Sequence, residues 1–340
     1  MSRIIINGRF LCHHITGVER YARELVAELD KIVKPGEIEM AIPPEIDSVP
    51  EYKNIPIKKV GMFHNRLWEH ISFPIYVMKR KAVSLNLCNV SPLLSPGIVC
   101  IMDTKIKAHP EFFSWKFLLW YRLIFANGIS RSKKIITISD FSKNEICKYY
   151  KVDRSKINVV PCAWQHFERI KYDENALEKY GLKNKNYCFS MCSLEPNKNF
   201  KWIAEIAQKY EDIDFVISGS INKKVFANGM GFECPDNVKL IGYITDEEAK
   251  SLMRDCSAFL FPTFYEGFGM PPLEALSAGC KCVVVSDTEI MHEIFGDSVM
   301  YIDPFTYTMP AFITHGDISA ILNKYDWRSS AMRLKQLIEI

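Results

Sequence analysis

Residues 266–279 read EGFGMPPLEALSAG, in which Glu266 and Glu274 stand eight positions apart with two glycines and a Pro-Pro pair between them. The preceding run Ser257–Phe261 is short and apolar, which is typical of a buried strand. Gly279 is typical of the residue that follows a helix C-terminus. The stretch therefore predicts a strand, a glycine-rich loop and a helix. In open α/β sheets, ligands lie beside such loops, at the carboxyl ends of the strands.

The loop and the helix start have the chemistry to hold a phosphorylated ligand. Gly267 and Gly269 lack a side chain, so the backbone can approach a ligand closely. Pro271 and Pro272 suit a first helical turn, whose free N–H groups and positive dipole end favour a phosphate. We expect Glu274 to fall in that first turn, ionised and able to accept hydrogen bonds from ribose or sugar hydroxyls. The alternative is a surface loop whose glutamates only cap a helix.

The rest of the chain alternates strand-like and helix-like segments. The predicted strands are 3–6, 39–42, 99–102, 134–138, 187–192, 214–218, 238–241, 258–261, 281–285 and 299–302. The predicted helices include 18–33, 65–80, 114–130, 141–150 and 327–340. Such alternation implies parallel sheets with right-handed crossovers. The sequence therefore predicts an α/β protein with two Rossmann-like domains facing a central cleft, and a boundary in the polar stretch 163–185.

Several segments, in order and spacing, resemble the retaining glycosyltransferases of family 4, the group 1 glycosyltransferases with the GT-B fold. Residues 266–274 resemble their E-x7-E signature. The other matching segments are ITGVERYA at 15–22, ITISDFS at 136–142, LEPNKN at 194–199, GYITDE at 242–247 and YIDP at 301–304. The resemblance implies an acceptor domain at 1–165, joined by a terminal helix at about 325–340, and a nucleotide-sugar domain at 166–324.

The resemblance also implies roles for individual residues. Glu274 would bind the ribose, Glu266 would lie against the donor sugar, and Lys198 would hold the diphosphate, although a lone lysine is commonly just solvated. Gly17 would approach the donor phosphate or the acceptor, unless it is an ordinary turn glycine. The remaining residues expected at the nucleotide sugar are Gly267, Phe268, Gly269, Met270, Pro271, Tyr243 and Ile244.

The chain departs from the family at two positions. Asn197 stands where the family often has an arginine, and Met102 stands where many members have a histidine before Asp103. A thioether cannot replace the hydrogen bonds of an imidazole. We therefore expect Asp103 to contact sugar or acceptor hydroxyls with help from His109, for which a structural role is the alternative. Trp68-Glu69 resembles a pair in the family's acceptor domain, with core packing as the alternative for Trp68.

Composition excludes several other classes. A net charge of +3 gives no support for a nucleic-acid partner. The eleven cysteines include no Cys-x-x-Cys pair, and the D-x-D spelling at Asp212 and Asp214 precedes a strand, whereas a metal-binding one follows it. Gly229-Met-Gly231 lacks the third glycine of a dinucleotide fingerprint. We expect neither a metal nor a cofactor, the nucleotide sugar being a substrate.

The sequence also bears on the compartment. The N-terminus enters a strand without the apolar region of a signal peptide, and unpaired cysteines suit a reducing cytoplasm. The aromatic segment 114–125 is apolar nearly all the way round, which favours a buried core helix over an interfacial membrane helix. Lys79-Arg80-Lys81 and Lys133-Lys134 could touch anionic headgroups. The inner face of the cytoplasmic membrane is therefore a candidate partner.

The resemblance implies a retaining, metal-independent hexosyltransferase that uses a GDP-, UDP- or dTDP-sugar. The acceptor would be a glycan or a lipid-linked oligosaccharide in bacterial O-antigen or capsule assembly. Met102 and Asn197 motivate one alternative, a catalytically degenerate nucleotide-sugar-binding partner. The other alternative is a GT-B nucleotide-sugar epimerase, against which the E-x7-E run argues.

Overall fold

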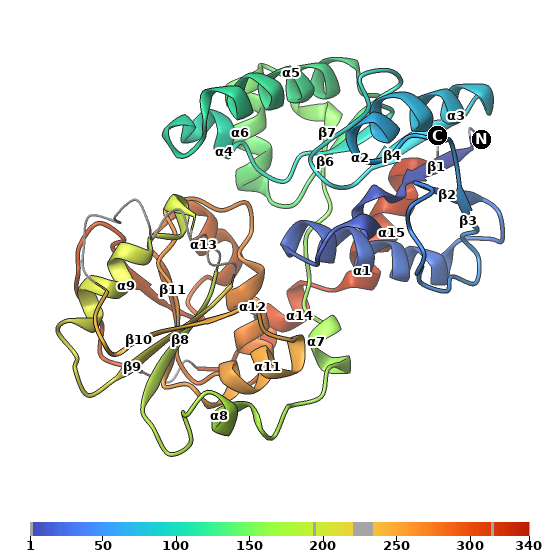
Figure 1. Ribbon diagram of the computed structural model, residues 1–340. Helices are drawn as coiled ribbons and strands as arrows, with labels where there is room; N and C mark the ends of the chain where they lie inside the picture. The colour runs from blue at the N-terminus through green and yellow to red at the C-terminus, as the bar shows by residue number, and fades with distance from the viewer. Residues whose placement is uncertain (1–2, 193–194, 220–233, 314–315, 340) are drawn as a thin grey trace. The chain divides into compact units, whose positions relative to one another are not determined.

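The computed structural model describes residues 3–192, 195–219, 234–313 and 316–339, and the chain forms two compact units (Figure 1). The first unit contains residues 1–162 and 325–340, and the second contains residues 163–324. The segment Gly229–Gly231, considered above as a dinucleotide fingerprint, and Leu194 of the LEPNKN segment lie outside the described residues.

The first unit is built on a parallel sheet with the strand order β3-β2-β1-β4-β5-β6-β7. Its strands are β1 (Ile4–Asn7), β2 (Ile38–Ile42), β3 (Ile57–Lys59), β4 (Val83–Asn86), β5 (Ile98–Cys100), β6 (Lys134–Thr137) and β7 (Ile157–Val159). Every residue of β1, β2, β4 and β5 is buried, as expected for parallel strands covered on both faces.

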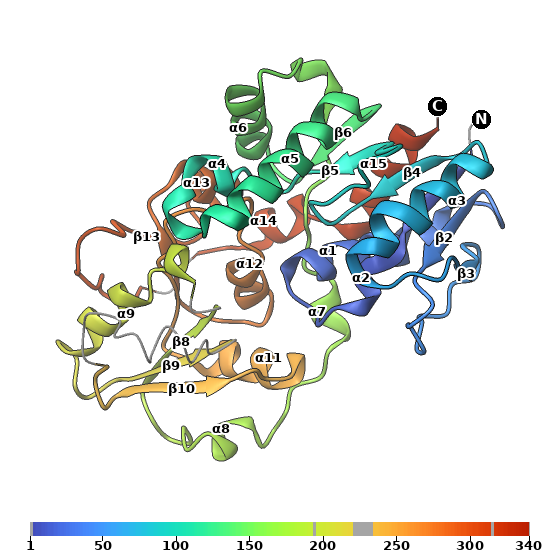
Figure 2. The same ribbon diagram turned by 45° about the horizontal axis from the view of Figure 1, so that its top comes forward.

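Helices cover both faces of this sheet (Figures 1 and 2). They are η1 (Gly8–Cys12), α1 (Gly17–Ile32), α2 (Asn65–Leu67), η2 (Trp68–Ser72), α3 (Phe73–Lys79), α4 (Lys105–Ala108), η3 (Pro110–Phe112), α5 (Trp115–Arg131), α6 (Asp140–Tyr150), η4 (Arg154–Lys156) and α15 (Trp327–Ile338). α2, η2 and α3 follow one another without a break and form one helical segment.

The second unit contains a parallel sheet with the strand order β10-β9-β8-β11-β12-β13. Its strands are β8 (Tyr187–Met191), β9 (Asp214–Ser218), β10 (Val238–Gly242), β11 (Ala258–Phe261), β12 (Val283–Ser286) and β13 (Met300–Ile302). Its helices are α7 (His166–Arg169), α8 (Ala176–Lys179), η5 (Pro196–Lys198), α9 (Phe200–Ala207), α11 (Asp246–Asp255), α12 (Met270–Ser277), α13 (Glu289–Phe295) and α14 (Ser319–Lys324). The predicted α/β class with two parallel sheets is confirmed.

Both sheets reverse their direction of growth at one point. In the first unit the chain runs outward from β1 to β3 and then restarts at β4 on the other side of β1. In the second unit it runs from β8 to β10 and restarts at β11 on the other side of β8. At such switch points the loops after two neighbouring strands diverge and leave a crevice at their carboxyl ends, where ligands bind. In the described part of the chain, β8 is followed by residue 192 and residues 195–199, and β11 is followed by the loop 262–269.

The chain end belongs to the first unit. α15 packs against α1, with Trp327 buried edge-on to Tyr21 at a centroid distance of 6.0 Å. Lys335 Nζ donates to the carbonyl of Ile32 at 2.9 Å, and Ser330 Oγ donates to that of Pro161 at 2.9 Å. The last helix therefore completes the core of the first unit after the chain has built the second.

Candidate functional site

An ion pair lies at the switch point of the second sheet. Lys198 ends the turn η5 after β8, and Glu266 lies in the loop after β11. Lys198 Nζ and Glu266 Oε1 are 2.7 Å apart, and the two side chains are 18% and 17% exposed. The structure thus brings together, from neighbouring strands, the cation and the first carboxylate that the sequence predicted.

The surroundings of Lys198 keep it protonated. Burial by itself would lower the pKa of Lys198, but the Glu266 carboxylate outweighs this effect and the pKa is raised. The ammonium also lies 5.4 Å from the ring centroid of Phe261, at the end of β11. A charged amine at this position can compensate the negative charge of a phosphate.

Two asparagines fix the loops that carry this pair. The backbone carbonyl of Asn197, which is buried, accepts a hydrogen bond from the N–H of Phe264 at 2.8 Å and so ties η5 to the loop before Glu266. Asn199 adopts a left-handed conformation with φ of 54° at the start of α9, and its Nδ2 donates to the carbonyl of Pro304 at 2.8 Å. Asn197, where the family often has an arginine, is therefore part of the scaffold.

The helix α12 begins at Met270, directly after Gly269. Gly269 has φ of +102°, and a Cβ there would lie 3.2 Å from Met291 Cε and 3.3 Å from Phe295 Cε2. Only glycine fits both the backbone and the space. Gly279 has φ of +90°, and hydrogen bonds from Gly279 N to Leu276 O and from Cys280 N to Ala275 O close the helix in a Schellman motif.

The expectation that Glu274 lies in the first turn of this helix is wrong. Since the helix begins at Met270, Glu274 is its fifth residue, and the first turn contains no acidic residue. Pro271 and Pro272 do lie in that turn, where they remove two of its free N–H groups. A phosphate at this helix end would therefore meet the amides of the loop and of Met270.

Glu274 is buried and paired with a histidine that the sequence analysis missed. His166 Nε2, in α7, donates to Glu274 Oε1 at 2.8 Å, and both side chains are almost completely inaccessible. Within the described parts of the chain, Oε2 of Glu274 has no hydrogen-bonding partner. Lys250 Nζ, from α11, donates to the carbonyls of Phe167 and Ile170 and anchors α7. His166 escaped notice because it lies in the polar stretch interpreted as a domain boundary.

The other donor-site predictions fall into two kinds. The side chains of Phe268, Met270 and Ile244 are buried, so these residues can offer a ligand only their backbone. Tyr243 follows β10 and is 69% exposed. Gly267 lies in the loop before α12, and Pro271 lies in the first turn of that helix.

The D-x-D segment lies at the opposite edge of this sheet. Asp214 is the first residue of β9, and its Oδ2 lies 2.6 Å from Lys239 Nζ and 3.4 Å from Lys185 Nζ. Asp214 thus serves in ion pairs at the amino ends of the strands. Over residues 3–192, 195–219, 234–313 and 316–339, no group of three or more His, Cys, Asp or Glu side chains is arranged to hold a metal ion.

Gly17, Asp103 and His109 belong to the first unit. Gly17 is the first residue of α1, and a Cβ there would meet no described atom within 4 Å. Asp103 follows β5, and its Oδ1 accepts from the N–H of Lys105 at 2.9 Å. His109 Nδ1 lies 2.9 Å from Glu111 Oε1, and its ring stacks on Phe112. His109 and Asp103 both lie in the segment that follows β5, and their contact with a ligand stays a prediction.

Met102 fills space in the interior. Its side chain is 5% exposed, its N–H donates to Asn89 Oδ1 at 2.7 Å, and its carbonyl accepts from Ser142 Oγ at 2.8 Å. The position is therefore tightly held by the first unit itself.

A buried polar cluster lies at the switch point of the first sheet. Asn7, at the end of β1, donates through Nδ2 to Glu69 Oε1 at 3.0 Å and to Asn86 Oδ1, at the end of β4, at 3.1 Å. Arg9 Nη1 lies 3.2 Å from Glu69 Oε2. Burial raises the pKa of Glu69, and the Arg9 guanidinium offsets part of this effect. Trp68 itself is core: it is fully buried and its Nε1 donates to the carbonyl of Val60 at 2.7 Å.

Of this cluster, only Glu69 had been singled out from the sequence. A usable signal exists in the two strands, because both β1 and β4 end in an asparagine after an otherwise largely apolar run. Asparagines at the carboxyl ends of two buried strands indicate polar groups that need partners.

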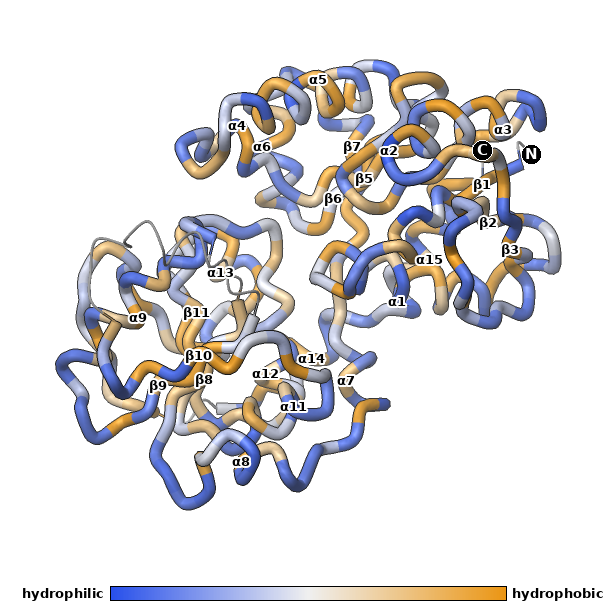
Figure 3. The backbone as a smooth tube through the Cα atoms, in the orientation of Figure 1, coloured by the Kyte–Doolittle hydropathy of each residue, from blue (hydrophilic) through white to orange (hydrophobic). Residues whose placement is uncertain are grey.

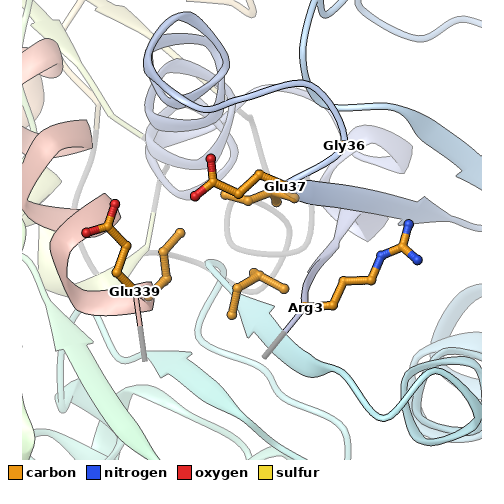
Figure 4. A pocket seen from close by; sticks show the side chains of 7 residues that line it. Arg3, Gly36, Glu37 and Glu339 are labelled. Atoms are coloured by element: carbon orange, nitrogen blue, oxygen red, sulfur yellow. The ribbon is translucent and has the colours of Figure 1, made fainter. Parts of the chain in front are cut away.

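A surface pocket of about 280 Å³ in the first unit lies away from these edges (Figure 4). It is lined by Arg3 and Ile4 at the start of β1, by Gly36, Glu37 and Ile38 at the start of β2, and by Ile338 and Glu339. It therefore opens at the amino ends of the strands, the edge at which open α/β sheets do not bind their ligands.

Comparison with known protein families identifies the second unit. Residues 173–308 match the family described as "Glycosyl transferases group 1". The chain carries a group 1 glycosyltransferase domain. This glycosyltransferase domain contains Lys198, Glu266 and Glu274, the three charged residues placed above at the switch point and in α12.

Two bacterial relatives resemble the chain beyond this domain. It is 24% identical over 335 residues to the O-antigen chain mannosyltransferase B of Escherichia coli, covering 89% of this chain and 87% of the relative. It is 25% identical over 217 residues to the O-antigen chain mannosyltransferase RfbU of Salmonella typhimurium, covering 63% of this chain and 58% of the relative.

Solved structures show the same fold over essentially the whole chain. Sucrose-phosphate synthase from Thermosynechococcus elongatus superposes with a TM-score of 0.71 at 12% identity, over 99% of this chain and 98% of that one. Anabaena Alr3699/HepE, in complex with UDP and glucose, gives a TM-score of 0.67 at 13% identity over 100% of both chains. The chain therefore has the GT-B fold.

Proposed function

We propose that this glycosyltransferase moves a sugar from a nucleotide-sugar donor to a glycan or lipid-linked acceptor, with retention of configuration and without a metal. The observation that carries the proposal is the Lys198–Glu266 pair at the switch point of the second sheet. It places one cation and one carboxylate, both partly accessible, where a diphosphate and a sugar ring would adjoin.

The charged side chains and the backbone of the loop would contact different parts of such a donor. Lys198 and the backbone amides near Met270 would stabilise the negative charge that develops on the diphosphate as the bond to the sugar breaks. Glu266 would hold the sugar hydroxyls, and Glu274, oriented by His166, would accept from the ribose. The leaving phosphate would then take the proton of the acceptor hydroxyl on the same face, and the protein's own contribution is positioning.

Mannose is the sugar we propose for transfer, because both bacterial relatives described above are mannosyltransferases of O-antigen chains. The acceptor would accordingly be a growing surface polysaccharide. We propose that the reaction takes place in the cytoplasm, where nucleotide sugars are available.

A donor screen tests the binding half of the proposal. Thermal shifts with GDP-, UDP- and dTDP-sugars should single out one donor, because a ligand at 100 times its dissociation constant stabilises by roughly 2.7 kcal/mol. Nucleotide release should then require an acceptor. Donor binding without turnover for any acceptor would favour the degenerate partner, and turnover without an acceptor would favour the epimerase.

Two variants test the charged pair in the same assay. Lys198→Ala should lower kcat by roughly 10²–10³-fold, the range for removing one electrostatic stabiliser of the transition state. Lys201→Ala, an exposed lysine three residues further on, is the matched control and should keep full activity. Full activity of Lys198→Ala would remove the diphosphate role.

Excess EDTA tests the independence from metal ions. Activity should persist, because in the proposed mechanism Lys198 and backbone amides compensate the diphosphate charge that a metal ion would otherwise compensate. Loss of activity in EDTA and its recovery with manganese would overturn the metal-free mechanism.

A further inference from the structure

The helical segment α2–η2–α3 presents an apolar stripe to solvent. Leu67, Ile71, Ile75 and Met78 are spaced by four, four and three residues, which places them on one face, and each is 37–59% exposed. The opposite face carries Trp68, Phe73 and Val77, which are completely buried in the first unit. The stripe is therefore additional to the face that the helix needs for folding.

α5 presents a second stripe of the same kind. Trp115, Leu119 and Leu123 recur every fourth residue and are 57–70% exposed. Ile124, Phe125 and Ile129 on the opposite face pack into the core of the unit. The expectation of a helix buried on all sides is therefore wrong, because only one side of α5 lies against the sheet.

The two helices are neighbours on one face of the sheet (Figures 1 and 2). The His70 ring meets the Trp120 ring edge-on at 5.5 Å, and the Arg66 guanidinium lies 5.9 Å from the Trp120 centroid. Figure 3 shows that much of both segments is apolar. Apolar patches of this extent, formed by two adjacent helices, usually mark an interaction surface.

The exposed charges carried by the two helical segments themselves have one sign. Within residues 65–81 and 114–133 the only carboxylate is Glu69, which is buried and bound to Asn7 and Arg9. The exposed cations of these segments include Arg66, Lys79, Arg80, Lys81, Lys116 and Arg122. The net charge of the whole chain is only +3, so this basic character is local.

We propose that this face, formed by the exposed sides of α2–α3 and α5, docks the protein on the surface of a membrane with anionic lipid headgroups. The two stripes would enter the boundary between headgroups and acyl chains, with Trp115 at the interface. The cations would lie among the lipid phosphates. Among the described helices none is both long and apolar enough to cross a membrane.

Vesicle sedimentation of the full-length protein tests this docking without any sugar substrate, so its outcome is independent of the proposed reaction. The protein should bind vesicles of phosphatidylcholine with phosphatidylglycerol, and bind pure phosphatidylcholine more weakly. The triple variant Trp115→Ser, Leu119→Ser, Leu123→Ser should lose at least about tenfold in binding. Its thermal stability should be unchanged, because all three side chains are exposed.

A matched triple variant serves as the control. Val49→Ser, Ile313→Ser and Met332→Ser remove three exposed apolar side chains elsewhere, and vesicle binding should remain at the wild-type level. A second set, Lys79→Gln, Lys81→Gln and Lys116→Gln, should weaken binding to anionic vesicles and flatten its dependence on salt. The set Lys183→Gln, Lys201→Gln and Lys281→Gln should do neither.

Three results would overturn the proposal. If the wild-type protein does not bind anionic vesicles, lipid is not the partner. If the serine triple variant binds vesicles as tightly as the wild type does, this face is not the docking surface. A dimer in solution that the serine variant abolishes, measured by light scattering, would assign the face to a second copy of the chain.

Discussion

At the scale of single residues, His166 and Glu274 form a hydrogen-bonded pair that is buried inside the second unit. A buried carboxylate that loses its hydrogen-bond donor keeps the full cost of its desolvation. The pair therefore couples the stability of the second unit to the orientation of the residue proposed to bind ribose.

His166→Ala should accordingly destabilise the protein by roughly 1–3 kcal/mol and weaken donor binding. Urea denaturation and calorimetric titration with the donor would measure the two effects. His292→Ala is the control, since His292 also pairs with a carboxylate, that of Asp287, but both side chains are more than half exposed. Equal effects of the two variants would show that burial of the pair is unimportant.

Gly17 offers a test that separates binding from folding. Its backbone is not left-handed and a Cβ there meets no described atom within 4 Å, so Gly17→Ala should leave stability unchanged or raise it by up to about 1 kcal/mol. If a ligand approaches the start of α1 closely, the same variant should raise KM. Unchanged kinetics would make Gly17 an ordinary turn residue.

At the scale of secondary structure, Gly269 sets where α12 begins and hence which backbone amides the proposed donor would meet. Gly269→Ala should cost about 1–3 kcal/mol, because the left-handed backbone and the contacts with Met291 and Phe295 both oppose a Cβ. Gly279→Ala shares the positive φ but has open space around it, so it should cost less. Thermal unfolding of both variants checks this order, and the reverse order would contradict it.

The sequence predicted the strands of the second unit well because they are apolar runs bounded by turns. The ranges 214–218 and 258–261 agree with β9 and β11 residue for residue. β3, β4 and β7 were not predicted. β3 and β7 are three residues long, and β4 carries the buried polar residues Ser84 and Asn86, whose partners, the carbonyls of Ser95 and Pro96, are visible only in the fold.

Site residues could be predicted from the sequence where they belong to a recognisable motif. They could not be predicted where their role depends on a contact between segments that are distant in the sequence. Lys198 and Glu266 carried recognisable signals, and the fold brought them to 2.7 Å. His166 carried no such signal, because its role depends on the hydrogen bond to Glu274, which lies 108 residues away in the sequence. The position of Glu274 in its helix was misjudged because the prolines suggested a later start than Gly269 imposes.

At the scale of the whole molecule, the return of the chain to its first unit makes that unit depend on residues 325–340. Trp327→Ala should destabilise the first unit by about 3–5 kcal/mol, because a fully buried indole leaves a cavity beside Tyr21. Hydrogen exchange would show reduced protection in residues 3–162, with residues 163–324 unchanged. Equal loss of protection in both halves would contradict this division.

The contacts that hold Lys198, Glu266 and Glu274 have a consequence for how such enzymes diversify. Their surroundings are shaped by residues that all lie within 163–324, namely Phe261, Asn197, His166 and Met291. Residues 163–324 form a compact unit that contains these supporting residues. An exchange of residues 163–324 between related enzymes, by recombination or by design, would move the proposed donor site as one piece and leave the residues of the proposed docking face in place.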